Sequence, residues 1–243
     1  MMEFIEADWD APPGVRGVAT TRAGGTSQGP FASLNLALHV GDDATAVRSN
    51  RARVREALRL TAEPCWLEQE HGTRVVNACQ GVERPRADAS IGRGPGQVCA
   101  VLTADCLPVL LCTRAGDRVA AVHAGWRGLA AGVIESTLAA LESPPDEVLA
   151  WLGPAIGPAA YEVGEDVRAR FTAGDARAAG AFTANPRGRW QADLRALARL
   201  RLHAAGVPAV SGHNLCTWAE PERFYSCRRE RTCGRMATLV WIE

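Results

Sequence analysis

The sequence has 243 residues, of which 47% are hydrophobic and 22% are charged, as in an ordinary globular protein with a full core. The formal net charge is +0, so no overall field attracts nucleic acid or an anionic membrane, and neither is expected as a partner. All 27 basic residues are arginines, which excludes Schiff-base enzymes, Walker A nucleotidases and protein kinases, because each needs a catalytic lysine.

The cysteine pattern favours a cytoplasmic protein with reduced thiols. The amino-terminal residues have neither a basic start nor an apolar core, so no signal peptide is expected, and no apolar stretch reaches transmembrane length. Eight cysteines in such a chain predict free thiols rather than a disulfide framework. Apolar neighbours predict that five of them are small core residues: Cys65, Cys79, Cys99, Cys112 and Cys216. No feature indicates an oligomeric state.

In chain order, the pattern predicts strands and helices without a linker or an internal repeat. Strands are predicted over 15–20, 98–103, 107–113, 118–124, 147–152 and 236–242. Amphipathic helices are predicted over 47–60, 129–142 and 193–205. A hairpin among mixed helices and strands favours one α/β or α+β domain over 1–243, with a mixed sheet.

A G-x-S-x-G motif at 25–29 resembles the nucleophile elbow of serine hydrolases. That motif needs a helix that opens at the serine. Here Pro30 follows at once and no helical pattern continues, so a serine hydrolase is not favoured.

One cysteine and two histidines stand in small Gly- and Asp-rich motifs. They are His71 in 67–73, Cys106 in 103–108 and His123 in 120–128. A thiolate and two imidazoles form a three-ligand set of the kind that catalytic zinc uses, with a fourth position open to water or substrate. A Cys106 nucleophile activated by His123 without a metal is the alternative.

The predicted hairpin places two of these residues on one face. If the four residues 114–117 form the loop, Thr113 pairs with Arg118, and His123 lies opposite Pro108. Cys106 and His123 are then diagonal cross-strand neighbours about 7–8 Å apart. A register shift of one residue would separate them onto opposite faces. Spacing alone does not place His71.

Several charged residues near these ligands are candidates for catalysis or binding. A helix starting near Gly128 would present free N–H groups to an anion, and Arg127 adds a cation there. Asp105 points away from Cys106 in a regular strand, but in a loop it could orient a ligand or act as a general base. Arg228, in the carboxy-terminal arginine cluster, is a candidate to face the substrate.

These motifs together resemble the YfiH-like laccase-domain family. The resemblance rests on the segments 33–42, 69–72, 86–89, 103–108, 122–128, 153–164 and 224–236, which cover nearly the whole chain in order. It implies an α/β protein with a layered α/β/β/α arrangement and a metal site formed by His71, Cys106 and His123. Asn35, in the first segment, is expected to bind substrate together with Arg127 and Arg228. Glu70 and Cys227 depart from the family pattern, because an apolar residue and a tyrosine are common there.

Members of the family have been given three different functions, and the sequence supports them to different degrees. Members have been described as copper polyphenol oxidases, as purine nucleoside phosphorylases that also deaminate adenosine and cleave methylthioadenosine, and as amidases that edit peptidoglycan precursors. Five histidines cannot build a multicopper array, and a single Cys/His/His site suits zinc better, although Cu(I) also favours thiolate. We therefore expect a zinc enzyme acting on a purine nucleoside with phosphate. The editing amidase, the copper oxidase and a redox or metal-storage protein are alternatives.

Overall fold

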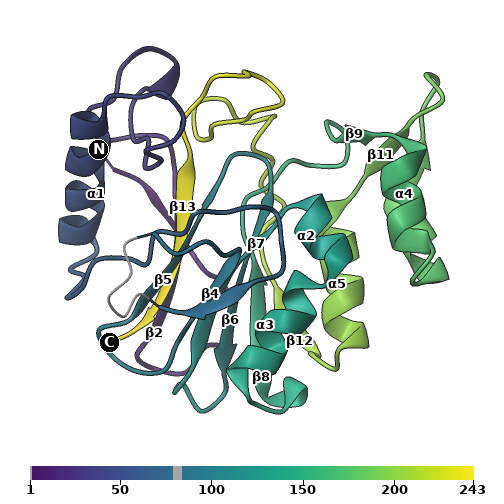
Figure 1. Cartoon of the computed structure of the whole chain (residues 1–243), viewed down its shortest axis with the longest axis horizontal. Coiled ribbons are helices and arrows are strands. Elements are labelled where there is room, and N and C mark those ends of the chain that lie inside the picture. The colour runs from purple at the N-terminus through teal and green to yellow at the C-terminus, as the bar shows by residue number, and fades with distance from the viewer. Residues whose placement is uncertain (1, 79–83) are drawn as a thin grey trace.

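The computed structural model describes residues 2–78 and 84–243, and its two larger sheets are stacked, with helices on both outer faces (Figure 1). The α-helices are α1 (Ala44–Ala57), α2 (Trp126–Ala131), α3 (Val133–Leu141), α4 (Glu165–Thr172) and α5 (Leu194–Ala204). Three short 3-10 helices accompany them: η1 (Gly29–Phe31), η2 (Pro145–Glu147) and η3 (Ala176–Ala181). The mixture confirms the predicted α/β class.

The strands form three sheets of different size and pairing. A four-stranded antiparallel sheet has the order β1 (Phe4–Glu6), β2 (Val15–Thr20), β13 (Met236–Ile242), β5 (Val98–Thr103). A six-stranded mixed sheet has the order β12 (Ala209–Ser211), β8 (Val148–Leu152), β6 (Leu107–Thr113), β7 (Val119–Ala124), β4 (Ala89–Gly92), β3 (Val75–Asn77). A three-stranded antiparallel sheet has the order β10 (Phe182–Ala184), β11 (Trp190–Ala192), β9 (Glu162–Val163).

Alternating side chains divide the core into three layers, which confirms the layered α/β/β/α arrangement. Between the two large sheets lie apolar residues of both, such as Val101, Val240, Leu110 and Trp151. The opposite face of the four-stranded sheet packs on α1, and that of the six-stranded sheet packs on α2, α3 and α5. Strands buried on both faces explain why their sequences are almost continuously apolar.

Most predicted elements are confirmed, and one helix is wrong. The first predicted helix is α1, which starts earlier because the Asp43 carboxylate accepts a hydrogen bond from the Thr45 N–H at 2.9 Å. The single helix predicted over 129–142 is instead α2 and α3. Gly132 separates them with φ of +100°, a conformation that glycine adopts without a steric penalty. The apolar spacing continues through this break, so the sequence pattern does not reveal it.

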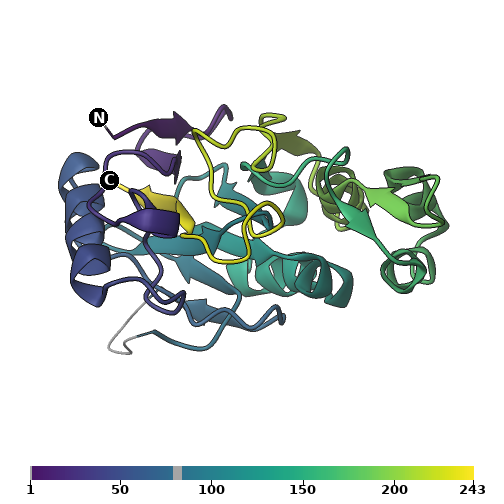
Figure 2. The ribbon, with the colours of Figure 1, turned by 90° about the horizontal axis from the view of Figure 1, so that it is seen from above.

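The small sheet and α4 form a lobe at one end of the molecule, which Figure 2 shows beyond α2 and α5. Its strands have only two or three residues, too few for a period-2 pattern to be recognised. The sequence pattern therefore predicts none of β9, β10 or β11. None of the helices in residues 2–78 and 84–243 is long and apolar enough to cross a membrane.

The cysteines partly follow the expectation. Cys99 and Cys112 are buried and free, and burial raises the pKa of each thiol to about 12, as expected for small core residues. Cys216 is half-buried and free. Cys65 is buried, but it forms a disulfide, so the prediction of a reduced thiol is wrong for this residue. Cys79 lies outside the described residues.

Candidate metal centre

The structure brings His71, Cys106 and His123 together at one end of the six-stranded sheet. Their ligand atoms all lie within 4.8 Å of one another. Cys106 Sγ is 3.8 Å from His71 Nε2, and the two imidazole rings meet edge to face with centroids 4.7 Å apart. A Zn–S and a Zn–N bond together span about 4.4 Å, so one ion can bind both Cys106 and His71. The chemistry and the spacing of this donor set fit a metal.

The hairpin of β6 and β7 positions Cys106 and His123, two of the three candidate ligands. Pro108 pairs with His123, and Thr113 N–H donates to Arg118 O at 3.0 Å, so the predicted register is confirmed. With this register, Cys106 and His123 share the face of β6 and β7 that points toward the four-stranded sheet, as Leu110 does. The alternation that buries the apolar residues therefore also aligns the two ligands.

The third ligand, His71, comes from a loop that is fixed by neighbouring strands. The Gln69 amide pairs with the Leu102 backbone through two hydrogen bonds of 2.8 and 2.7 Å at the end of β5. His71 follows with φ of +61°, an uncommon left-handed conformation for a residue with a side chain. A loop with this conformation has no recognisable sequence period, so spacing does not predict where His71 lies.

Asp88, for which no sequence pattern predicts a role, connects the loop of His71 to the strand of His123. Its buried carboxylate accepts hydrogen bonds from the backbone N–H groups of residues 70, 71 and 72, and from His123 Nδ1 at 2.8 Å. Burial opposes its ionisation, but these donors hold the pKa of Asp88 below its usual value. The signal in the sequence is a carboxylate in an apolar strand entry, which needs hydrogen-bond donors when it is buried.

Close backbone approach at Gly125 lets the three ligands meet. A Cβ atom there would lie 2.8 Å from the His71 ring and 3.1 Å from Cys106 Sγ. Gly125 also precedes α2, which starts at Trp126 rather than near Gly128. The Ala-Gly-Trp part of the motif therefore makes space for the His71 ring.

The charges of Cys106 and His123 are coupled. Burial opposes ionisation of the Cys106 thiol, but the charge of His123 and hydrogen bonds from both histidines lower its pKa to about 6. Burial also opposes the charged form of His123, but the Cys106 thiolate and Asp88 raise its pKa to about 9. Without a metal, the pair is therefore a thiolate beside an imidazolium at neutral pH. A metal gains a thiolate directly and must displace one proton from His123.

The three ligands open into a cavity of about 410 Å³ that contains several cationic side chains. Arg127, Arg228 and Arg235 line it together with Asp105. The Arg228 guanidinium lies over the Tyr161 ring at 5.4 Å, and that of Arg127 lies over Trp126 at 4.5 Å. The cavity thus combines a His/Cys/His cluster that can bind a metal, arginines that can hold an anion, and aromatic walls that can hold a flat apolar group.

Asp105 and Asn35 make contacts that differ from those of a free catalytic group. Asp105 lies in a loop before β6, with φ of +97°. Its two carboxylate oxygens accept hydrogen bonds from Thr217 Oγ1 and from the Arg228 N–H, each at 2.7 Å. Asn35 is buried outside the cavity lining, and its side chain bonds to the backbone of Ala37 and Arg235. The structure therefore does not bring Asn35 to the cavity.

Other polar side chains lie in different environments. His39 lines the cavity, and burial together with Arg235 keeps the pKa of this imidazole below its usual value. His203 is at the end of α5, where Nδ1 contacts Val207 O. The Ser27 hydroxyl of the G-x-S-x-G motif donates to Asp42 at 2.6 Å, and no α-helix opens at the serine, because only the short 3-10 helix η1 follows. No sequence pattern predicts His39, Tyr161 and Arg235 as cavity residues, because they lie in loops far apart in the chain.

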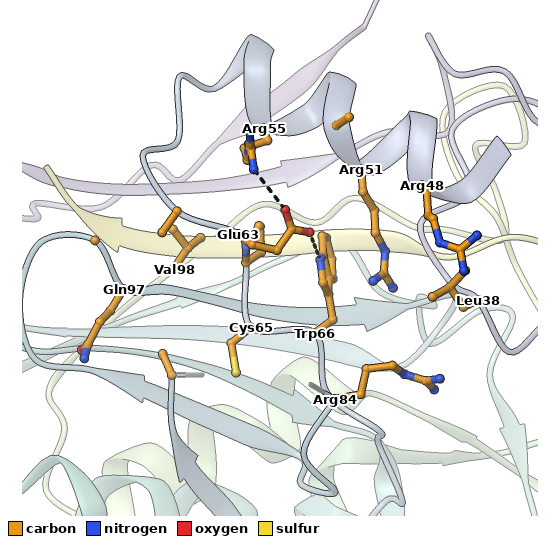
Figure 3. A pocket seen from close by; sticks show the side chains of 15 residues that line it. Leu38, Arg48, Arg51, Arg55, Glu63, Cys65, Trp66, Arg84, Gln97 and Val98 are labelled. Atoms are coloured by element: carbon orange, nitrogen blue, oxygen red, sulfur yellow. Dashed lines mark hydrogen bonds and ion pairs between the residues drawn. The ribbon is translucent and has the colours of Figure 1, made fainter. Parts of the chain in front are cut away.

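A second cavity, of about 630 Å³, lies between α1 and the start of β5 (Figure 3). Arg51 is buried there, its guanidinium lies 4.2 Å from the Trp66 ring centroid, and burial lowers its pKa to about 10. Figure 3 also shows Glu63 between Arg55 and the Trp66 indole, with which it forms an ion pair and a hydrogen bond. This cavity contains none of the three ligand residues.

Comparison with known proteins gives the family. The family described as multi-copper polyphenol oxidoreductase laccase matches residues 16–243. The chain belongs to this family. Purine nucleoside phosphorylase PA4543 of Pseudomonas aeruginosa is 54% identical to it over 245 residues, covering 100% of both chains. Purine nucleoside phosphorylase YfiH of Escherichia coli is 49% identical over 243 residues, again covering 100% of both.

Two crystal structures have the same fold. Neisseria meningitidis protein NMB0706 superposes with a TM-score of 0.95 at 50% identity, covering 99% of each chain. YlmD from Geobacillus stearothermophilus gives a TM-score of 0.88 at 31% identity, covering 95% of this chain and 93% of its own. These relatives confirm the YfiH-like resemblance and the mixed α/β fold.

Proposed function

We propose that this chain is a zinc-dependent purine nucleoside phosphorylase that acts on adenosine, inosine and methylthioadenosine and also deaminates adenosine. The observation that carries the proposal is the convergence of His71, Cys106 and His123 in a cavity lined by arginines. Relatives that are named purine nucleoside phosphorylases and match the whole chain support the choice of reaction.

Three atoms of the chain would hold the metal. They are Cys106 Sγ, His71 Nε2 and the Nε2 atom of His123, because Nδ1 of His123 donates to Asp88. Thiolate and imidazole together suit zinc, and they also suit Cu(I), so copper is the alternative ion. When bound, zinc would act as a Lewis acid that polarises the purine or a water molecule at the open position.

The arginines would hold phosphate during phosphorolysis. Arg127 lies in α2 and Arg228 in the carboxy-terminal loop, and both line the cavity. Their guanidinium groups can form paired hydrogen bonds with a phosphate. Since the chain has no lysine, these groups and Arg235 are the cations available. They would fix phosphate beneath the anomeric carbon of the ribose, while Tyr161 and Trp126 provide flat walls for the purine.

For deamination, Asp105 would carry the proton between the attacking water and the leaving amine. Each of its oxygens already accepts one hydrogen bond, from Thr217 or from Arg228. A carboxylate has about four acceptor positions, so both oxygens retain capacity for a water molecule. The same contacts tie Asp105 to the loop that carries Arg228, and changes at Asp105 would therefore affect both proposed reactions.

The family description as a multi-copper oxidase receives less support from the chain itself. Among five histidines, two belong to the ligand cluster, and residues 2–78 and 84–243 contain one group of at least three His, Cys, Asp or Glu residues close enough to bind an ion. A laccase needs several coppers bound mostly by histidine. A single mixed thiolate and imidazole site does not provide them.

The deciding experiment is incubation of metal-replete protein with adenosine, with and without phosphate, followed by chromatography. Adenine and ribose 1-phosphate that form only with phosphate are expected. Deamination should give inosine without phosphate, and inosine or its phosphorolysis product hypoxanthine with phosphate. Parallel incubation with inosine and methylthioadenosine tests the substrate range. If no nucleoside is converted while a muramyl–serine precursor is cleaved, the proposal fails and the editing amidase replaces it.

A further inference from the structure

Two free cysteines lie side by side at the edge of the metal-centre cavity. The sulfur atoms of Cys227 and Cys233 are 3.6 Å apart, and both residues are free. Cys227 is half-buried and lines the cavity, whereas Cys233 is buried behind it.

The surroundings favour a thiolate within this pair. Arg235 Nη1 lies 3.7 Å from Cys233 Sγ. The hydrogen bond from Cys227 and the charge of Arg235 outweigh burial and lower the pKa of Cys233 to about 7. The hydrogen bond to Cys233, followed by burial, raises the pKa of Cys227. Near neutral pH, the two sulfurs therefore share one proton, and a nucleophilic thiolate lies in contact with a thiol.

We propose that Cys227 and Cys233 form a redox modification site, which hydrogen peroxide converts to a disulfide. One sulfur attacks the peroxide, its O–O bond breaks, and a sulfenic acid and one water are formed. The other sulfur then attacks the sulfenic acid, the S–O bond breaks, and the oxygen leaves as a second water. The two thiols lose two electrons and two protons, and one peroxide becomes two waters. Cys227 gives the oxidant access because it faces the cavity.

Closing this disulfide would change the wall of the metal-centre cavity. An S–S bond is about 2.05 Å long, so the two sulfurs must approach by about 1.5 Å. Cys227 directly precedes Arg228, whose backbone N–H donates to Asp105 at 2.7 Å and whose guanidinium donates to Glu162 O at 2.9 Å. Movement of Cys227 therefore pulls on the residues that line the cavity. The modification itself does not depend on the proposed reaction.

Peptide mapping tests the modification without an activity assay. The folded, metal-replete chain is treated with hydrogen peroxide, its free thiols are alkylated, and it is digested with trypsin. Arginines at 223, 228, 231 and 235 release the peptides 224–228 and 232–235, each with one of the two cysteines. The expected product is these two peptides joined, with loss of two hydrogen atoms, and dithiothreitol should separate them. The proposal is wrong if the two peptides are instead recovered unlinked, with each cysteine either alkylated or oxidised on its own to sulfinic acid.

Matched variants separate this site from oxidation of Cys106. Cys227→Ser and Cys233→Ser should each abolish the linked product, whereas Cys112→Ser, at a buried thiol elsewhere in the core, should leave it unchanged. In the unmodified chain, nucleoside turnover should fall on oxidation and return with dithiothreitol. In Cys233→Ser, peroxide should cause no loss of nucleoside turnover that dithiothreitol can restore. A reversible fall of equal size in Cys233→Ser would overturn the link between the disulfide and the cavity.

Discussion

The candidate metal centre has two halves that are built in different ways. Cys106 and His123 belong to a β-hairpin whose register is fixed by apolar side chains on both faces, and His123 is buried. His71 is exposed and lies in a loop with a left-handed backbone conformation. One half is therefore held by the core, and the other by the hydrogen bonds of Asp88 and Gln69. The strand half should keep its geometry when the loop half is altered.

The largest expected effect is the loss of the metal from the strand half. Cys106→Ala or His123→Ala should remove stoichiometric zinc and nucleoside turnover, because each leaves one strand ligand and a loop ligand. His71→Ala should retain weakened zinc binding, since the hairpin still presents a thiolate and an imidazole on one face. Elemental analysis of the purified variants measures this difference, with His203→Ala as a control outside the cavity. Full zinc occupancy in Cys106→Ala would contradict the ligand assignment.

The same division explains which part of the site the sequence predicts. A four-residue loop between two apolar runs fixes the pairing of Pro108 with His123, and alternation then puts Cys106 on the same face. Both facts are local. His71 meets Cys106 through contacts 35 residues apart in sequence, which no local pattern encodes. The resemblance to the YfiH-like family, rather than spacing, supplied His71 as the third ligand.

The fold shows the same limit of local information. Long buried strands such as β5 and β13 coincide with the predicted ranges because their apolar runs are unambiguous. The break at Gly132 and the short strands of the small sheet escape prediction, since one glycine or three residues do not change a periodic pattern. Asp88 was detectable in principle as a buried carboxylate, but its partners are known only from the structure.

The next largest effect is expected at Asp88, which joins the two halves. Asp88→Asn keeps the size of the side chain but loses an acceptor, so it cannot satisfy both the loop N–H groups and His123. Removal of a hydrogen-bond partner of a metal ligand typically lowers metal affinity by about 10–100-fold. Competitive zinc titration should show a loss in this range, and Asp146→Asn, at an exposed carboxylate in η2, should show none. Equal affinities would mean that Asp88 does not position the ligands.

The smallest expected effect, taken per pH unit, is a gradual pH dependence of zinc affinity, and it arises in the strand half. His123, with its pKa raised to about 9, carries a proton at neutral pH in the metal-free protein, and zinc must displace it. Cys106, with its pKa lowered to about 6, is already a thiolate there. Zinc affinity should therefore rise about tenfold per pH unit up to about pH 9, level off above it, and fall more steeply below about pH 6. Titration against a chelator of known pH dependence measures the slope.

In Asp88→Asn, His123 loses the partner that stabilises its charge, so the plateau in zinc affinity should begin at lower pH. A flat affinity between about pH 7 and pH 8.5 in the unmodified chain would show that zinc displaces no proton from His123.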